Sequence, residues 1–231
     1  MIKYLTLFIV LIFSTPIFRQ DFNSSPKIKD FVKSKPGKNY FDQIGATDPG
    51  TVEIVQGKLR LSKNGPAGQP FFVRNTDLDG DPQFISMAFK IKATGKGASF
   101  AELFFGDDLA ADGKLDEVSK VYVRLGFNLS PEGFVIRNSN QGTNGTKTYE
   151  GEQSLLWYIN KSGKTQTYTA PDGSSQTVDN NRWDLWVGHT KEVDEAGVTT
   201  KTQALTNFKM VLATSIGVID LDDIEVNNLG N

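Results

Sequence analysis

A period-two alternation of apolar and polar residues, which runs from Thr51 almost to the end of the chain, limits the fold more than any other feature. Side chains alternate between the two faces of a β-strand, so each such run predicts a half-buried strand. Convincing helical periodicity is absent, and Gly-, Pro- and Asn-containing turns separate the runs. The predicted strands are residues 51–55, 58–62, 71–74, 83–92, 99–105, 120–127, 133–137, 154–160, 165–169, 175–178, 181–188, 204–212 and 217–226.

Many short strands at close spacing predict an all-β fold, a two-sheet antiparallel sandwich of the jelly-roll type. The 22 glycines and 16 phenylalanines fit short strands joined by tight turns. The acidic stretch 107–118 has only a weak helical pattern and is interrupted by Gly113, so we expect a loop with at most a helical turn. No linker is visible within residues 40–226, which favours a single sandwich domain over residues 21–231.

The N-terminus predicts export. Lys3 precedes an apolar run that is too short for a membrane span, which needs about 20 residues. We therefore expect residues 1–20 to be a secretory signal peptide, cleaved between Ser14 and Gln20, and the mature protein to be extracellular or periplasmic. Residues 24–50, rich in Lys, Pro, Gly and Ser, are expected to cross the surface as a loop.

Composition excludes several classes of function. The chain has no cysteine, which rules out disulfides, thiolate nucleophiles and cysteine-based zinc sites. His189 is the only histidine, so a multi-histidine metal site is excluded as well. The net charge of −2 gives no electrostatic footprint for nucleic acid. We expect a monomer with no nucleic-acid partner.

Clustered aromatic residues are the best candidates for a binding site. Flat rings stack on the apolar C–H face of sugars, and on a concave sheet they would form a saccharide platform. The alternative is that these large side chains fill the core of the sandwich. Trp186 follows Trp183 by three positions. Because this offset is odd, one side chain is expected to point inward and the other outward. The candidates are Trp157, Tyr158, Tyr168, Trp183 and Trp186.

The sequence offers weaker support for a catalytic site than for a binding site. Retaining glycosidases need two carboxylates about 5 Å apart, and no strand carries the expected carboxylate spacing. A lyase would need a base and a charge neutraliser. Tyr122, Arg124, Arg137 and His189 are of the right types, but their spacing singles out none of them.

The closing strand, residues 216–226, carries Asp220, Asp222 and Asp223. Alternation puts Asp220 and Asp222 on the same face as Val218 and Ile224. If that face is the core, Asp222 needs a hydrogen-bonding partner or a cation, because a bare buried carboxylate is costly.

Several segments together resemble the jelly-roll modules of secreted Bacteroidetes-type proteins, which are related to concanavalin A-like and carbohydrate-binding sandwiches. They are residues 41–45, 50–61, 168–173, 183–188 and 219–226. The resemblance implies a glycan or polysaccharide as partner. It also implies a structural calcium held by Asp222 or Asp223 together with Asp21. We expect no catalytic domain beside this sandwich, which disfavours the targeting role that such modules usually have.

The function expected from the sequence is a secreted, non-catalytic, carbohydrate-binding (lectin-like) sandwich. Two alternatives remain open: a polysaccharide lyase or glycoside hydrolase of concanavalin A-like fold, and an adhesion or structural protein of the envelope.

Overall fold

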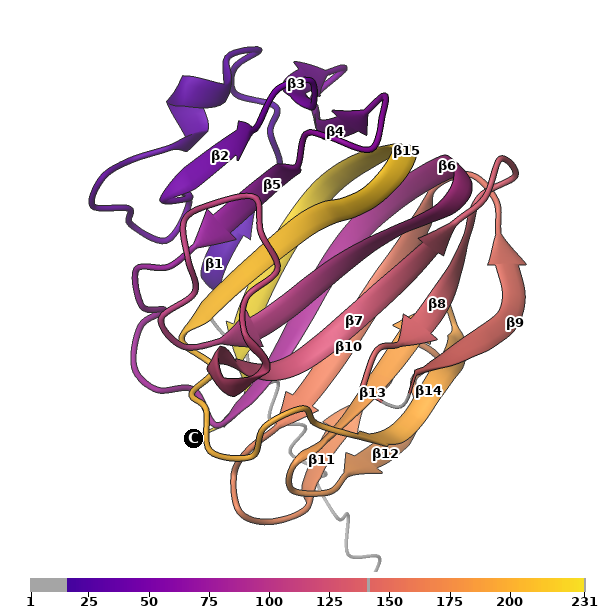
Figure 1. Cartoon of the computed structure of the whole chain (residues 1–231). Coiled ribbons are helices and arrows are strands. Elements are labelled where there is room, and N and C mark those ends of the chain that lie inside the picture. Colours follow the sequence, from indigo (N-terminus) through magenta and orange to yellow (C-terminus); the bar gives the residue numbers. More distant parts are fainter. Residues whose placement is uncertain (1–15, 141, 231) are drawn as a thin grey trace, which may run out of the picture.

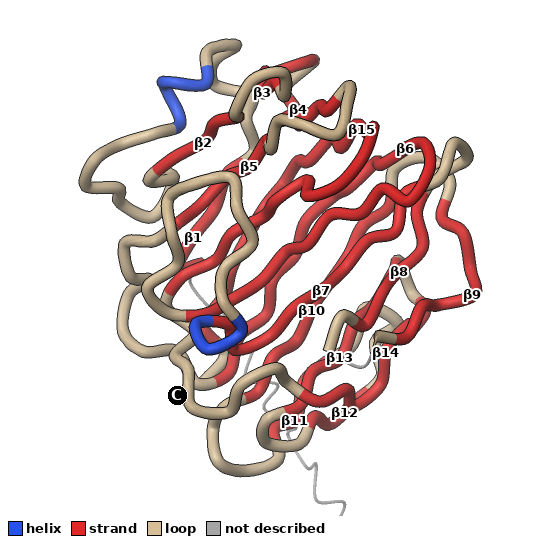
Figure 2. Tube along the Cα trace, in the orientation of Figure 1, coloured by secondary structure: helices blue, strands red, loops and turns tan. Residues whose placement is uncertain are grey.

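The computed structural model describes residues 16–140 and 142–230 and forms a two-layer antiparallel β-sandwich (Figure 1). Figure 2 shows that strands make up most of the chain, and the only helices among the described residues are two short 3₁₀ turns. The all-β, two-sheet prediction is confirmed. No helix in the described part of the chain is long and apolar enough to cross a membrane.

The elements follow in chain order. In the first half of the chain they are β1 (Pro16–Gln20), η1 (Ile28–Phe31), β2 (Gln43–Ala46), β3 (Thr51–Val55), β4 (Lys58–Lys63), β5 (Pro70–Arg74) and β6 (Phe84–Gly106). In the second half they are η2 (Val118–Lys120), β7 (Val121–Leu129), β8 (Phe134–Asn138), β9 (Thr143–Tyr149), β10 (Gln153–Asn160), β11 (Gln166–Thr169), β12 (Ser175–Val178), β13 (Arg182–Val187), β14 (Thr190–Gly197) and β15 (Asn207–Asn228).

Two long strands, β6 and β15, pair with each other along almost their whole length and run through both layers. In the first sheet, the order is β14-β13-β10-β6-β15, and β1 and β4 share the far edge of β15, with β3 beyond β4. In the second sheet, the order is β9-β8-β7-β6-β15-β5-β2. The β11–β12 hairpin stands apart as a separate pair.

The bend between the layers lies at the glycine-containing middle of this β6–β15 ribbon. Gly217 pairs with Gly95, and the register shifts on both sides of Thr214. A Cβ at Gly95 would lie 2.8 Å from Cβ of Leu129, and one at Gly217 would lie 2.9 Å from Cδ1 of the same leucine. Because glycine has no side chain, the ribbon can bend here while Leu129 packs directly on it.

The core lies between the two sheets and is aromatic. Phe105 on the second sheet meets Trp157 on the first, with ring centroids 5.8 Å apart, and Phe89 meets Phe127 at 6.4 Å. At one end, Phe18 of β1 packs edge-on against Phe41 and Phe208, with centroids 4.9 Å away in both cases. Burial of these rings is the main favourable contribution to the fold.

The N-terminal boundary differs from the prediction. Strand β1 occupies residues 16–20, inside the range that the sequence assigned to the signal peptide, and Phe18 is fully buried. Residues 1–15 lie outside the described residues, so the leader itself stays a prediction. The structure extends the sandwich to Pro16, ahead of the expected domain start at Asp21.

Candidate functional site

Two of the aromatic candidates lie in the core. Trp157 on β10 and Trp183 on β13 are both 0% exposed, and their rings meet edge to face with centroids 5.8 Å apart. Adjacent strands bring them together, because Ile159 of β10 pairs with Trp183. Both side chains therefore fill the space between the sheets.

The other three candidates form a cluster between the outer face of the first sheet and the β11–β12 hairpin, to which Tyr168 belongs. The rings of Tyr158 and Tyr168 stack with centroids 3.7 Å apart, and Trp186 donates from Nε1 to the Tyr168 hydroxyl at 3.1 Å. The Tyr168 hydroxyl in turn donates to the carboxylate of buried Asp184. Burial raises the pKa of Tyr158 to about 12.

Trp183 and Trp186 thus lie on opposite faces of β13, as their spacing predicts. However, Tyr168, the most exposed of the five candidates, is only 6% exposed. None of these five side chains offers an open ring face for stacking in this structure. A sugar could reach Trp186 or Tyr168 only if the β11–β12 hairpin lifted, so their ligand-binding role stays a prediction.

The three carboxylates expected to hold calcium each have a partner within the protein, although the β1–β15 ladder brings Asp21 near Asp223. Asp223 lies 2.7 Å from Nζ of Lys90, and Asp222 accepts the backbone N–H of Asp223 at 2.8 Å. Asp21, just after β1, accepts the backbone N–H of Asn23. Among the described residues there is no group of three or more acidic or histidine side chains that could hold a metal ion. Calcium binding by these carboxylates therefore stays a prediction.

The residues considered for lyase chemistry lie on different parts of the molecule. Tyr122 is buried, and its hydroxyl donates to the backbone carbonyl of Asn160. His189 is exposed, between β13 and β14 of the first sheet, where its Nδ1 contacts the carbonyl oxygen of Pro171 at 2.9 Å. Arg124 and Arg137 lie on β7 and β8 of the second sheet. They do not form one catalytic group.

The outer face of the second sheet is half covered. Over β5, β15 and β6, residues 107–117 form a loop that packs Leu109 on an apolar patch containing Phe71 and Phe104. Lys209 on β15 fixes this loop: its fully buried Nζ lies 2.7 Å from the carboxylate of Asp116 and 3.2 Å from that of Asp112.

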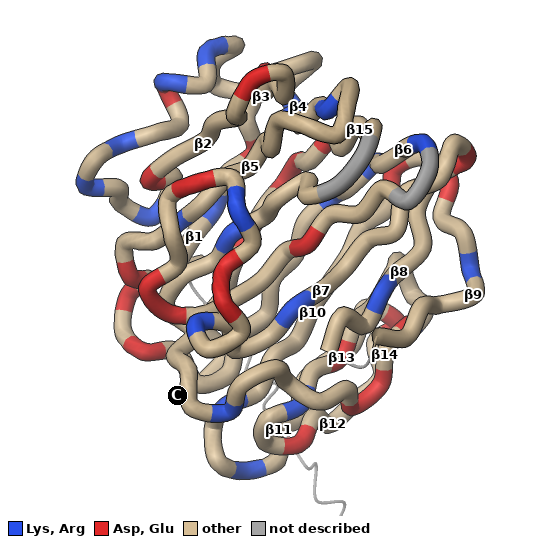
Figure 3. Tube along the Cα trace, in the orientation of Figure 1, with Lys and Arg blue, Asp and Glu red and all other residues tan. Residues whose placement is uncertain are grey.

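The other half of this face, over β6, β7 and β8, has no such cover and carries charge (Figure 3). Pairing places Glu102, Gly126 and Arg137 side by side on three neighbouring strands. The next row along includes Phe100 and Asn128. We call six residues the open polar cluster: Phe100, Glu102, Arg124, Asn128, Arg137 and Ser139.

Several polar atoms of the open polar cluster have no hydrogen-bonding partner in the protein. In the described part of the chain, five buried side-chain nitrogen or oxygen atoms lack one, and three of them are Nε of Arg124, Nε of Arg137 and Oγ of Ser139. Buried polar groups are normally paired, because leaving one unpaired costs about 1–3 kcal/mol. Their concentration here marks this face as the strongest candidate site.

A hollow of about 280 Å³ opens at this position. Its polar lining includes Arg124 and Ser139, whereas Val118 and Val198 supply apolar surface. Val118 is 56% exposed. The hollow therefore combines unsatisfied donors with exposed apolar carbon, a combination typical of small-ligand sites.

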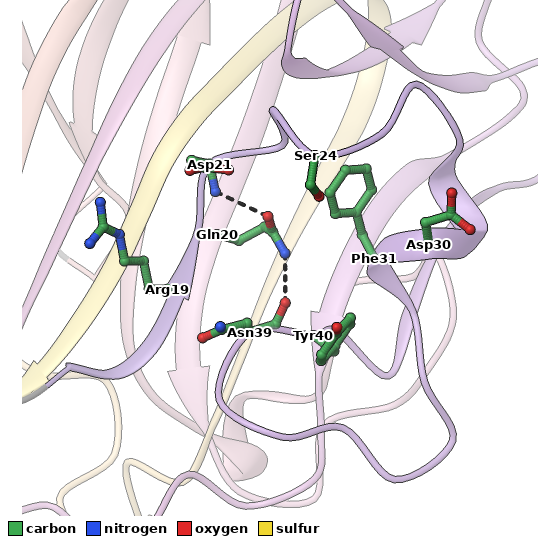
Figure 4. Close-up of a pocket in the computed structure, with 8 residues that line it drawn as sticks. All are labelled: Arg19, Gln20, Asp21, Ser24, Asp30, Phe31, Asn39 and Tyr40. Carbon is green, nitrogen blue, oxygen red and sulfur yellow. Dashed lines mark hydrogen bonds between the residues drawn. The ribbon is translucent and has the colours of Figure 1, made fainter.

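A second hollow, of about 380 Å³, lies beside β1 and is lined by Gln20, Asp21 and Tyr40 among others (Figure 4). Its groups mostly satisfy one another. Gln20 donates to the carbonyl of Asn39 at 2.6 Å and accepts from the backbone of Asp21, as the dashed lines in Figure 4 show. Asp30 accepts from Ser25. Although larger, this hollow offers less unmet hydrogen bonding.

Sequence reasoning noted Arg124 and Arg137 only as lyase candidates. The signal that could have identified the face is alternation in β7, where Arg124, Gly126 and Asn128 fall opposite apolar Val123, Leu125 and Phe127. Which of the two sheets remains uncovered could not be predicted, because that depends on the path of residues 107–117.

No protein-family model and no curated protein sequence matches the chain. Solved structures do. A carbohydrate esterase of bacteriophage phi24B matches with a TM-score of 0.60 and 8% identity, over 94% of this chain and 100% of that one. The potassium-bound carbohydrate recognition domain of Emp46p matches with a TM-score of 0.53 and 7% identity, over 93% and 98%.

A sialidase matches with a TM-score of 0.56 and 11% identity over 80% of this chain, which spans only 17% of the sialidase. At such low identity these matches show a shared fold. The expected resemblance to carbohydrate-binding β-sandwiches is therefore confirmed at the level of the fold.

Proposed function

We propose that this protein is a secreted, non-catalytic, glycan-binding β-sandwich that holds its ligand on the open polar cluster and the adjoining hollow. The observation that carries the proposal is the convergence of unpartnered polar atoms of Arg124 and Ser139 in one hollow. The fold shared with a carbohydrate recognition domain supports it. Secretion and bacterial origin rest on the sequence alone.

The chemistry of the hollow suits a sugar. A sugar ring presents hydroxyl groups that donate and accept hydrogen bonds, and C–H surfaces that pack against apolar side chains. Arg124 and Ser139 supply the polar partners, and Val118 and Val198 supply the apolar ones. An apolar partner alone would leave the buried polar atoms unpaired.

Binding without catalysis is favoured because the open polar cluster includes one carboxylate, Glu102, which is 3.8 Å from Nη1 of Arg124. Hydrolysis of a glycosidic bond by the common mechanisms requires two carboxylates that flank the bond. The cluster as described does not supply that pair.

The test is a glycan array with two matched variants. Val118→Trp would fill the hollow that Val118 lines, and we expect it to weaken binding of any glycan that the native protein retains. Leu115→Trp is the control: Leu115 is 39% exposed and precedes the same 3₁₀ turn, but it does not line the hollow.

Unchanged binding by Val118→Trp would remove the hollow from the site. Failure of the native protein to bind any glycan on the array would overturn the proposed function.

A further inference from the structure

The open polar cluster carries more positive than negative charge. Arg124 has a nearby carboxylate in Glu102, although the separation of 3.8 Å is too long for a hydrogen bond. Within the described residues, no carboxylate lies within ion-pair distance of Arg137. Its guanidinium lies 5.6 Å from the ring centroid of Phe100. One arginine of the cluster is therefore left without a counter-charge.

The contrast with Lys209 on the same outer face is informative. Lys209 is fully buried and is neutralised by two carboxylates of the covering loop, Asp112 and Asp116. The buried cation of the covered half is thus neutralised within the protein. Arg137 in the uncovered half has no carboxylate partner, although Arg124 and Arg137 are both partly buried and their Nε atoms lack hydrogen-bonding partners.

Gly126 allows close packing at the centre of the cluster. It pairs with Arg137 across the β7–β8 ladder and lies two residues from Arg124. A Cβ at this position would come within 2.6 Å of Oγ of Ser139 and 3.0 Å of Cβ of Arg137. A larger residue would displace Ser139 or Arg137, so the glycine lets these two residues of the cluster pack directly against β7.

We propose that the ligand of this face is an anionic sugar, whose carboxylate or sulfate oxygens accept hydrogen bonds from Arg137 and Arg124. The proposal rests on the glycan-binding function proposed above and names its ligand class. A planar guanidinium matches two oxygens of such a group, and charge-assisted hydrogen bonds are stronger than neutral ones. A neutral sugar would leave the charge of Arg137 uncompensated.

Two matched pairs of polysaccharides test the charge directly by titration calorimetry. Dextran sulfate is compared with dextran, and polygalacturonate with its methyl ester, so that within each pair the backbone stays the same. We expect binding of at least one anionic member, with an affinity at least tenfold above that of its neutral counterpart. The affinity should fall as salt is raised. Preference for dextran sulfate over dextran would identify the bound anionic group as sulfate. Preference for polygalacturonate over its methyl ester would identify it as carboxylate.

The matched variants are Arg137→Gln and Arg19→Gln. Each removes one positive charge, but the Arg19 side chain is 64% exposed and lies on β1 of the first sheet. We expect Arg137→Gln to lose roughly tenfold to a hundredfold in affinity for the anionic polymer, and Arg19→Gln to stay within about twofold. Thermal melting checks that both variants are folded.

Equal binding of charged and neutral members, or equal losses in the two variants, would overturn the anionic-ligand proposal. The glycan-binding function would still stand if Val118→Trp weakened binding of the neutral sugar. Absence of binding to all four polymers and to the array would overturn both.

Discussion

At the scale of the residue, Asp223 decides which side chains of β15 reach the core. Its φ of 49° is left-handed, and the pairing with β6 shifts register between Asp222 and Glu225. Ile219 and Leu221 are buried before this point, and Ile224 and Val226 are buried after it, so the strand changes parity. Bulges of this kind insert an extra residue into a strand.

The sequence prediction assumed unbroken alternation and placed Asp222 on the same face as Ile224. The structure corrects this. Asp220 and Asp222 point away from the core, and Asp220 meets Arg60 in a two-pronged pair at 2.6 and 2.8 Å. Alternation alone cannot reveal a bulge, because a left-handed aspartate looks like any other polar residue in the pattern.

Asp222 gives a pH-dependent prediction. Partial burial is the main cause that raises the pKa of Asp222 above its usual value. The folded state then binds the proton more tightly than the unfolded state. The associated stability is fully present below the unfolded pKa, near 4, and is lost as pH rises through the folded value.

We therefore expect Asp222→Asn to raise the melting temperature at pH 7 and to have a smaller effect at pH 3, measured by calorimetry at both pH values. The amide oxygen can still accept the backbone N–H of Asp223. Asp220→Asn serves as the comparison and should lower stability at pH 7, because it weakens the pair with Arg60. If Asp222→Asn raised the melting temperature by the same amount at both pH values, the burial argument would be contradicted.

At the scale of the element, the predicted strands were largely right where one face is apolar and wrong where it is not. Strand β9, which starts with the mostly exposed residues 143–148, and the charged edge strand β14 carry too little apolar pattern to be recognised. The long strands β6 and β15 were each predicted as two short ones, because the alternation is interrupted at residues 93–98 and 213–216. In the structure Gly95 and Gly217 lie in the bend of a continuous ribbon.

Strand β1 leads to a prediction about processing. It pairs with residues 224–227 of β15 and buries Phe18 completely, so residues 16–20 form part of the sandwich. We expect the signal peptide to be cleaved before Pro16, at the N-terminal end of the range inferred from the sequence. N-terminal sequencing of the secreted protein would show this.

Chains that start at Pro16 and at Asp21 provide the matched comparison. Loss of a buried phenylalanine alone typically costs about 3–5 kcal/mol, and the shorter chain also loses the β1 ladder. The free energy of unfolding, measured with denaturant, should be lower by at least that amount in the chain that starts at Asp21. Equal stability of the two chains would mean that β1 is dispensable and that the boundary at Asp21 was adequate.

At the scale of the whole molecule, the sequence predicted the architecture better than the site. Alternation and turn chemistry suffice for a two-sheet sandwich, because they record which face of each strand is buried. They do not record what covers an outer face. The β11–β12 hairpin packs its own Tyr168 against Trp186 and Tyr158, whereas the face with Arg124 and Arg137 is left open.

The calcium prediction is also tested on the whole molecule. Asp223 is paired with Lys90, and Asp220 with Arg60, so we expect the melting temperature to be the same with EDTA and with millimolar calcium. A ligand that binds only the folded state raises the melting temperature as its concentration rises. An increase of several degrees in calcium, abolished by Asp223→Ala, would show that a metal binds there after all.

The β6–β15 ribbon has a consequence for how this chain must fold. It joins residues near 85 to residues near 228, and residues near 106 to residues near 207. Contacts so distant in sequence make folding slow, because a long loop must be closed before they form. Until the final strand has been synthesised, β6 lacks a neighbour along one entire edge and neither layer can be completed. The nascent chain should therefore stay unfolded until β15 has been synthesised, a form that would suit the export predicted from the N-terminal sequence.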